Sequence, residues 1–309
     1  MSMKAEISSC RVCVEPPVRK RTLAARSVVF TMFFLCILFS IDTLANDHEK
    51  SSAEVKPLSL GLIPHLSTNL LMRKYQNLIN YIEERLKRPV DISTAPDYKT
   101  YMERCAEGKF DLYMTAPHMA VYHEKNNQHI RLAKFSNELR SVVTVREDSP
   151  YASVKDLKGK KISAPDPLAV NTINGEVTLE KGGLNIGSDV SIKYSASNNN
   201  PLFLVAQKKV DAAVTGLPGY KMVSKRGKLK QPLRILKTSN PVPHMMFLSP
   251  PRVTGEDREK FKIALLDIGN HETGKAFMSG VPFGNIVEVS DTDASKLADM
   301  LSILEKRLK

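Results

Sequence analysis

Apolar runs of strand length alternate with amphipathic segments from residue 58 onward. LSLGLIP (58–64) predicts a buried strand, and 70–88 predicts a helix because apolar residues recur at helical spacing: Leu71, Tyr75, Leu78, Ile82 and Leu86. Asp97 is placed to begin the next helix and Gly108 to end it. Further elements are expected as strands at 90–95, 110–115 and 130–135, and as a helix from Ala116 with Pro117 at its first position. This β-α-β-α-β-α-β order predicts a parallel sheet covered by helices.

The alternation restarts at residue 141 and ends in a long helical tail. Strands are expected at 141–148, 161–164, 191–197, 210–216, 233–239 and 244–250, and helices within 149–160 and at 171–182, 201–209, 255–280 and 293–308. A helical tail after a second α/β unit predicts a chain end that returns to the first unit. We therefore expect an α/β fold of two lobes with a cleft between them. Lobe 1 comprises 57–146 and 243–309, and lobe 2 comprises 147–242.

The first 45 residues differ from the rest of the chain. A cluster of Arg19, Lys20, Arg21 and Arg26 precedes the apolar run SVVFTMFFLCILFSI (27–41), and small residues follow at Thr43 and Ala45. This is the order of a secretory signal peptide, and the run is shorter than the roughly 20 residues that span a bilayer. We expect a signal peptide at 1–45, a linker at 46–56 and a periplasmic location. An uncleaved membrane anchor and a cytosolic buried helix are the alternatives.

Removal of such a leader would change the cysteine count and the charge. Cys10, Cys13 and Cys36 fall within it, so Cys105 alone remains and no internal disulfide is possible. A buried helix cysteine is expected there rather than a catalytic thiol. The leader carries a net +3 of the chain's +12, which leaves +9. Such a charge suits anionic ligands or an anionic membrane surface, and no nucleic-acid motif accompanies it.

Four loops connect a predicted strand to the helix that follows: 64–69, 115–118, 166–174 and 195–201. Free N–H groups at a helix start stabilise an anion without Lys or Arg, and asparagine adds both donors and an acceptor. Alternatively, these polar residues only cap the helices. The candidate ligand-binding residues are His65, Ser67, Thr68, Thr115, His118, Asn171, Thr172, Ser195, Ser197, Asn198 and Asn199.

The remaining chemistry-bearing residues suggest neither catalysis nor a cofactor. His65 and His118 either contact the ligand or are satisfied surface histidines. No histidine has metal-ligand spacing with carboxylates, and neither a phosphate-binding P-loop nor a nucleophile elbow is present. Glu176 and Glu180 share a helix face, have no evident cleft partner and are expected to be solvated. We therefore predict no metal, no cofactor and no enzymatic activity.

Several segments together resemble one family. GKFDLYMTAPHMAVY (108–122), SVVTVREDSPYASVKDLKGKKISAPDP (141–167), VDAAVTG (210–216) and ALLDIGNHETGKAFMSG (264–280) are similar to the periplasmic phosphate/phosphite/phosphonate-binding proteins of ABC transporters. The resemblance runs from about Leu58 to the C-terminus. It implies a type II periplasmic-binding-protein-like fold, whose two lobes are joined by two crossover strands and close on a ligand. We expect the hinge near 141–146 and 241–247.

The chain departs from the family at ligand positions. The family's hydroxyl-rich run is reduced to Thr172 within Asp166-Pro167-Leu168-Ala169-Val170-Asn171-Thr172. Met114 replaces the aromatic residue that precedes the glycine-proline turn of the family. Asn198 and Asn199 replace the histidine-aspartate pair that family members often carry at the third loop. The resemblance thus implies the scaffold but leaves the ligand open.

These observations lead to a functional prediction. We expect an exported, monomeric protein that captures a small, phosphate-, phosphite- or phosphonate-like anion and delivers it to the permease of an ABC importer. The alternatives are a ligand-sensing or accessory protein acting with a membrane receptor or kinase, and an enzyme on the same fold.

Overall fold

A computed structural model of the protein describes residues 56–309, apart from 196, 226 and 228. The expected signal peptide (1–45) and all but the last residue of the expected linker (46–56) lie outside the described residues. Among the residues that are described, no helix has the length and apolar character to cross a membrane.

The first sheet has the strand order β13-β4-β12-β3-β1-β2. Its strands are β1 (Leu58–Leu62), β2 (Val90–Ser93), β3 (Leu112–Thr115), β4 (Ile130–Phe135), β12 (Met246–Ser249) and β13 (Ile286–Val287). β1 pairs in parallel with β2 and β3, as the sequence predicts. β12 is antiparallel to both β3 and β4 and lies between them, so the sheet is mixed. A strand from the end of the chain thus completes the first sheet.

The second sheet has the order β10-β6-β9-β7-β8. Its strands are β6 (Ser141–Arg146), β7 (Lys161–Ala164), β8 (Ser191–Tyr194), β9 (Ala212–Gly216) and β10 (Leu233–Thr238). β7 pairs in parallel with β8 and β9, whereas β6 is antiparallel to β9 and β10. In both sheets the parallel strands send their carboxyl ends toward helix starts.

The chain passes between the two sheets twice, through short segments that pair with each other. β5 (Glu138–Leu139) and β11 (Val242–Pro243) form an antiparallel two-stranded sheet, with Val242 opposite Leu139. Our assignment of 141–146 to lobe 1 and to the hinge is wrong for this strand. β6 pairs on both edges within the second sheet and its first five residues are buried, so it is a central strand and not a connector.

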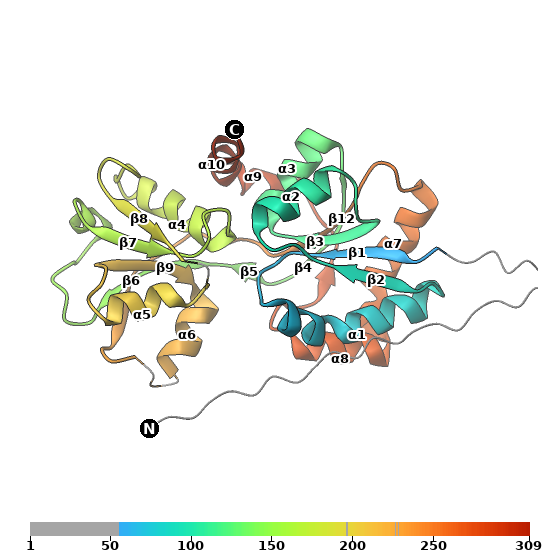
Figure 1. The fold of residues 1–309 in the computed structure, drawn as a ribbon, viewed down its shortest axis with the longest axis horizontal. Coiled ribbons are helices and arrows are strands. Elements are labelled where there is room, and N and C mark those ends of the chain that lie inside the picture. Colours follow the sequence, from blue (N-terminus) through green and yellow to red (C-terminus); the bar gives the residue numbers. More distant parts are fainter. Residues whose placement is uncertain (1–55, 196, 226, 228) are drawn as a thin grey trace, which may run out of the picture. The chain divides into compact units, whose positions relative to one another are not determined.

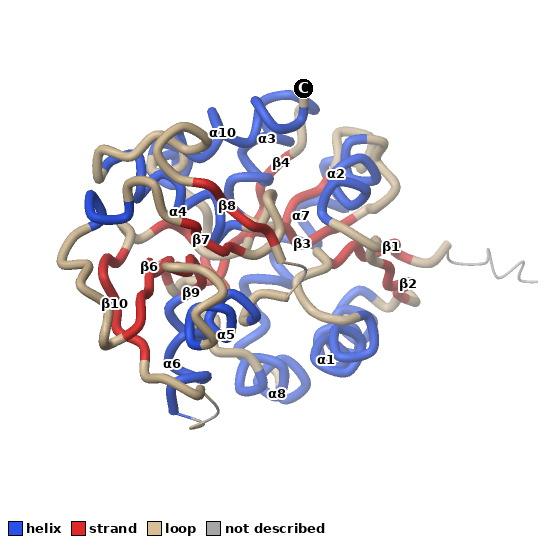
Figure 2. The backbone as a smooth tube through the Cα atoms, turned by 60° about the vertical axis from the view of Figure 1, so that its left-hand side comes forward, coloured by secondary structure: helices blue, strands red, loops and turns tan. Residues whose placement is uncertain are grey.

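Helices cover both faces of each sheet (Figures 1 and 2). Around the first sheet these are α1 (Thr68–Leu86) and α8 (Glu272–Gly280) on one face and α2 (Tyr98–Ala106) and α3 (Pro117–Asn127) on the other, with α7 (Gly255–Asp267) following β12. Around the second they are α4 (Val170–Lys181) on one face and α5 (Asn200–Ala206) and α6 (Leu217–Lys225) on the other. The chain closes with α9 (Asp291–Ser295) and α10 (Ala298–Leu308), and short 3-10 helices occupy Val154–Leu157 and Ile268–Asn270. The sequence did not predict α6 or β13.

The C-terminal helix lies against helices of both sheets. α10 contacts α3 and α4, and its Met300 and Leu304 belong to the same apolar core as Ile173 and Val177 of α4. The predicted return of the chain end to the first unit therefore also involves the second.

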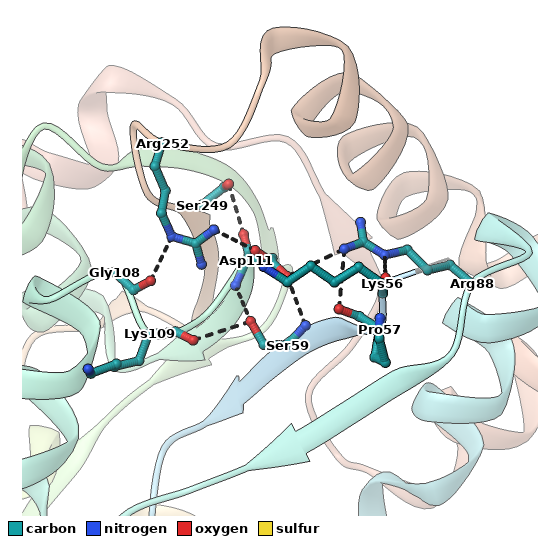
Figure 3. A network of polar contacts seen from close by, with 9 residues as sticks. All are labelled: Lys56, Pro57, Ser59, Arg88, Gly108, Lys109, Asp111, Ser249 and Arg252. Atoms are coloured by element: carbon teal, nitrogen blue, oxygen red, sulfur yellow. Dashed lines mark hydrogen bonds and ion pairs between the residues drawn. The ribbon is translucent and has the colours of Figure 1, made fainter. Parts of the chain in front are cut away.

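A satisfied polar network lies at the amino ends of β1 and β3 (Figure 3). The carboxylate of Asp111, 8% exposed, accepts from Ser59 N–H at 2.9 Å and from Arg252 Nη1 at 2.7 Å. Arg88 Nη2 lies 3.8 Å from the same carboxylate, and Ser249 Oγ donates to the Asp111 carbonyl at 2.9 Å. The network joins three strands of the first sheet at the end opposite the loops that follow β1 and β3.

Candidate functional site

The loops that follow parallel strands of the two sheets touch each other. His118, at the start of α3, places Nε2 3.0 Å from the carbonyl of Leu168, in the loop between β7 and α4. Asn198, in the loop between β8 and α5, donates from Nδ2 to the His65 carbonyl at 3.1 Å, in the loop between β1 and α1. The four predicted loops therefore contact each other in two pairs, each of which joins the two sheets beyond the carboxyl ends of their strands, where ligands bind in open α/β sheets.

The helices that begin at these loops have no side-chain cap. Ala116 and Ala169 hold the N-cap positions of α3 and α4, and alanine has no acceptor. Ser67 of α1 and Asn199 of α5 hold the N-cap position without a side-chain cap bond. Elsewhere the chain does cap helices: Asp97 accepts from Thr100 N–H at 2.7 Å, as predicted for α2. The alternative that the four loops serve only as helix caps is therefore not supported.

His118 is fully buried and is not the surface histidine that we considered as an alternative. A carbonyl only accepts, so Nε2 carries the proton that binds Leu168, and burial lowers the pKa of this imidazole to about 4. Near neutral pH the ring is uncharged, and Nδ1 presents a lone pair. This Nδ1 is buried and has no partner among the described residues.

Thr172 lies in the first turn of α4, with Asn171 beside it. Its side chain is fully buried, and Oγ1 has no partner in the part of the chain that is described. The Asn171 amide lies against Gly216 at the end of β9, where a Cβ would stand only 3.0 Å from the amide atoms. Both residues therefore belong to the start of α4 and not to the preceding loop.

His65 is turned toward its own loop. Its Nδ1 lies 3.0 Å from the Ile63 carbonyl and its Nε2 lies 3.5 Å from the Tyr75 hydroxyl, and burial lowers its pKa to about 4. Its backbone, and not its ring, makes the contact with Asn198. Ser67 and Thr68 are exposed at the start of α1.

The three asparagines have different surroundings. Asn198 joins the two sheets and also accepts, at its carbonyl, from Thr215 Oγ1 at 2.9 Å. Asn199 lies against Gly219 of α6, where a Cβ would stand 2.5 Å from its Oδ1. Asn200 donates from Nδ2 to Ser195 Oγ at 2.9 Å and closes the turn.

The other candidates and the residues that we missed complete the site. Thr115 is fully buried and donates to Met119 Sδ at 3.6 Å, whereas Ser197 is exposed. Thr215, Gly216 and Gly219 were not predicted. The signal was the Thr-Gly end of VDAAVTG, which marks a fifth strand-to-helix junction. No group of three or more His, Cys, Asp or Glu able to hold a metal ion occurs within the described residues.

The two sheets are joined by two crossovers, and helix starts from both sheets converge. This arrangement defines a two-lobed periplasmic binding fold of type II. The predicted fold class is confirmed. A family model described as "ABC transporter, phosphonate, periplasmic substrate-binding protein" matches residues 60–294. The chain belongs to this family, whose members are substrate-binding proteins of transporters, and the match supports this role over the sensory alternative.

Solved structures of low sequence identity share the fold. PhnD1 from Prochlorococcus marinus in complex with methylphosphonate aligns with a TM-score of 0.71 at 14% identity, over 81% of this chain and 99% of that one. A binding component of an ABC phosphonate transporter from Pseudomonas aeruginosa aligns at 0.68, with 16% identity over 82% and 87%. The periplasmic aliphatic sulphonate-binding protein of Escherichia coli aligns at 0.58, with 19% identity over 82% and 88%.

Proposed function

We propose that this protein captures a small phosphonate-like oxyanion between the starts of α3 and α4 and delivers it to the permease of an ABC importer. One observation carries the proposal. Within residues 56–309 as described, His118 Nδ1 and Thr172 Oγ1 are buried without partners, at the uncapped starts of helices that belong to different sheets. An unmet buried polar atom costs about 1–3 kcal/mol, and a ligand that bonds to both atoms would recover this cost.

The donors and acceptors of the site favour one protonation state of the ligand. The free N–H groups at the starts of α3 and α4 suit anionic oxygens. The neutral His118 presents an acceptor at Nδ1, so the oxygen facing it should carry a proton. A singly protonated phosphonate or phosphite offers both kinds of oxygen, whereas a sulfonate at neutral pH carries no proton. We therefore propose phosphonate-type ligands over sulfonates.

Binding would hold the two lobes together. The His118–Leu168 and Asn198–His65 contacts each join a loop of one sheet to a loop of the other. We propose that they form as the lobes close on the ligand, with β5 and β11 as the hinge. For the division of the chain we propose lobe 1 at 57–140 and 243–309 and lobe 2 at 141–242, which moves β6 into lobe 2.

We propose binding without catalysis. Cys105, the cysteine expected to remain in the mature chain, is 1% exposed in α2, and burial raises the pKa of its thiol far above the ordinary value. A thiol in this environment is not a nucleophile. We also propose a monomer in the periplasm, released from a cleaved leader. Intact-mass measurement of the exported protein would determine whether cleavage occurs. An uncleaved leader would favour the sensory alternative.

The test compares methylphosphonate with methanesulfonate, which have similar shapes and differ in the proton. Calorimetry, melting temperature and small-angle scattering would be measured with both, and with phosphite, phosphate and sulfate. We expect methylphosphonate to bind, to raise the melting temperature and to compact the protein, and methanesulfonate to bind at least tenfold more weakly. Equal affinity for both would overturn the proposed role of His118. No response to any of these anions would overturn the proposed ligand class.

A further inference from the structure

Arg307 lies two residues from the C-terminus of the chain, in the last turn of α10, and contacts three residues of the second sheet's unit. One nitrogen, Nη1, donates to the carbonyl of Pro167, in the loop that leads into α4. The other, Nη2, pairs with Glu176 Oε2 on α4 and donates to the Tyr194 hydroxyl at 3.1 Å. The guanidinium also lies 5.7 Å from the centre of the Tyr194 ring, and Tyr194 OH donates to Glu176 Oε1 at 3.2 Å.

Glu176 contradicts our expectation of a solvated carboxylate. The residue is 2% exposed, and burial raises its pKa above the ordinary value, although hydrogen bonds from Arg307 and Tyr194 oppose that shift. A buried carboxylate needs a paired, hydrogen-bonded partner, and Arg307 supplies it with the planar fork that suits such pairs. A buried carboxylate of α4 is therefore paired by an arginine of α10.

The same helix is tied to the first sheet's unit. Lys125 of α3 pairs with Glu305 of α10 at 2.8 Å, and α10 contacts both α3 and α4. α10 thus links the two helices whose starts form the proposed ligand site. A second ion pair, Lys181 with Asp299 at 2.7 Å, joins α4 and α10 near the other end of α10, but its side chains are 59% and 60% exposed.

Residues outside the second sheet's unit form hydrogen bonds to two successive carbonyls of the loop between β7 and α4. Arg307 binds the Pro167 carbonyl, and His118 binds the Leu168 carbonyl. Asp166 closes the loop by accepting from Leu168 N–H at 2.8 Å, and α4 begins at Val170. The position of this loop fixes where the free N–H groups of α4 point.

We propose that Arg307 is a positioning residue for ligand binding: it fastens α10 to Glu176 and to the Pro167 carbonyl, and this contact holds the ligand loop and the closed arrangement of the two lobes. It touches no proposed ligand atom and acts through the loop and α4. The inference rests on the proposed function, because its effect is read as affinity for an oxyanion.

The conservative variant Arg307→Lys isolates this role. Lysine keeps the charge beside Glu176, so the carboxylate stays paired, but a single ammonium does not reproduce the guanidinium fork between Glu176 and Pro167. We expect methylphosphonate to bind about tenfold more weakly, mainly through faster dissociation, while the melting temperature changes little. The matched control is Lys181→Met, which removes the exposed ion pair of the same two helices and should leave Kd within about twofold.

A distance measurement separates positioning from general loss of structure. Spin labels at Asn77→Cys on α1 and Lys221→Cys on α6, both exposed positions, report the separation of the lobes. Arg307→Lys should lose part of the short-distance population that the parent protein shows with methylphosphonate, and Lys181→Met should keep it. If Arg307→Lys binds and closes like the parent, the inference is wrong and the proposed function stands. If the parent itself neither binds nor closes, the proposed function and the inference both fail.

Discussion

The two ends of the first sheet carry buried polar groups in opposite states. At the amino ends of β1 and β3, Asp111 is surrounded by donors from Ser59 and Arg252. Beyond the carboxyl end of β3, His118 is fully buried, yet its Nδ1 has no partner among the described residues. A satisfied group contributes to stability whether or not a ligand is present, whereas an unsatisfied one costs stability until a ligand arrives. Substitutions at the two ends should therefore separate folding from binding.

The largest effect is expected at Asp111. Asp111→Ala leaves the Ser59 N–H and the Arg252 guanidinium without their buried acceptor and should cost about 3 kcal/mol of unfolding free energy. For a chain of this size that corresponds to a fall of roughly 6–12 °C in melting temperature. Thermal and urea unfolding would measure it. The affinity for methylphosphonate should not change at a temperature where the variant is folded, and a weaker Kd there would contradict the comparison.

The two ends should also respond differently to pH. His118 has a folded pKa of about 4 against the ordinary 6.5, so the unfolded chain binds a proton first as pH falls. Its contribution is complete above pH 6.5 and is lost as pH falls toward 4, by on the order of 1–2 kcal/mol at pH 5. Burial alone would raise the pKa of Asp111, but hydrogen bonds from Ser59 and Arg252 lower it below the ordinary 3.8. Its contribution is lost only as pH falls past that value.

The unfolding free energies of the parent, Asp111→Ala and His118→Gln between pH 7 and pH 4 would measure this difference. The gap between the parent and Asp111→Ala should change little across the range, because the carboxylate begins to titrate only at its lower end. The stability of His118→Gln relative to the parent should increase as the pH falls, because the parent loses stability through His118 whereas glutamine does not titrate. A constant gap for both variants would show that His118 is not held neutral by burial.

The binding role of His118 rests on one nitrogen. In His118→Gln the side-chain NH2 group can still donate to the Leu168 carbonyl, but the amide oxygen, although an acceptor, does not occupy the position of Nδ1. We expect about a tenfold weaker Kd for methylphosphonate by calorimetry, the cost of one hydrogen bond to a charged ligand.

The control for this prediction is His123→Gln, on the same helix. His123 is also fully buried, and its Nε2 has no partner in the described part of the chain. Its Nδ1, however, lies 3.0 Å from Asn127 Oδ1, and its ring lies among Tyr113, Tyr122 and His129. It should leave Kd unchanged. Equal losses from both variants would mean that α3 responds as a whole and that Nδ1 of His118 has no special role.

The sequence predicted most of the fold and the loops of the site because these depend on local patterns. Apolar periodicity located β1, α1 and β7, and strand-to-helix junctions located the loops of His118 and Asn198. The sequence missed α6, because Pro218 and Gly219 within it are typical of turns and gave no helical signal. With α6 unrecognised, Thr215 was not seen to lie at a strand-to-helix junction.

Contacts between distant segments were beyond the reach of local patterns. Glu176 appears solvated on a helical projection, and only the return of α10 brings Arg307 to it across 131 residues. The burial of His118 likewise depends on the loop of Leu168, 50 residues away. Such long-range contacts decide which buried polar groups have hydrogen-bond partners. The sequence therefore predicted the candidate residues but not which of them are satisfied.

The smallest expected effect is the sharpest test of the comparison. Thr172→Val replaces a fully buried hydroxyl, which has no partner in the chain as far as it is described, with a methyl group of the same shape. Without ligand the variant should be more stable, by about 1 kcal/mol, because the desolvated hydroxyl is removed, and methylphosphonate should bind a few-fold more weakly. Thr178→Val on the same helix is the control, because Thr178 Oγ1 donates to the Asn174 carbonyl at 2.7 Å. That variant should lose stability and keep its affinity. A loss of stability in Thr172→Val would mean that its hydroxyl is satisfied in the free protein, and the distinction between the two ends of the sheet would not extend to α4.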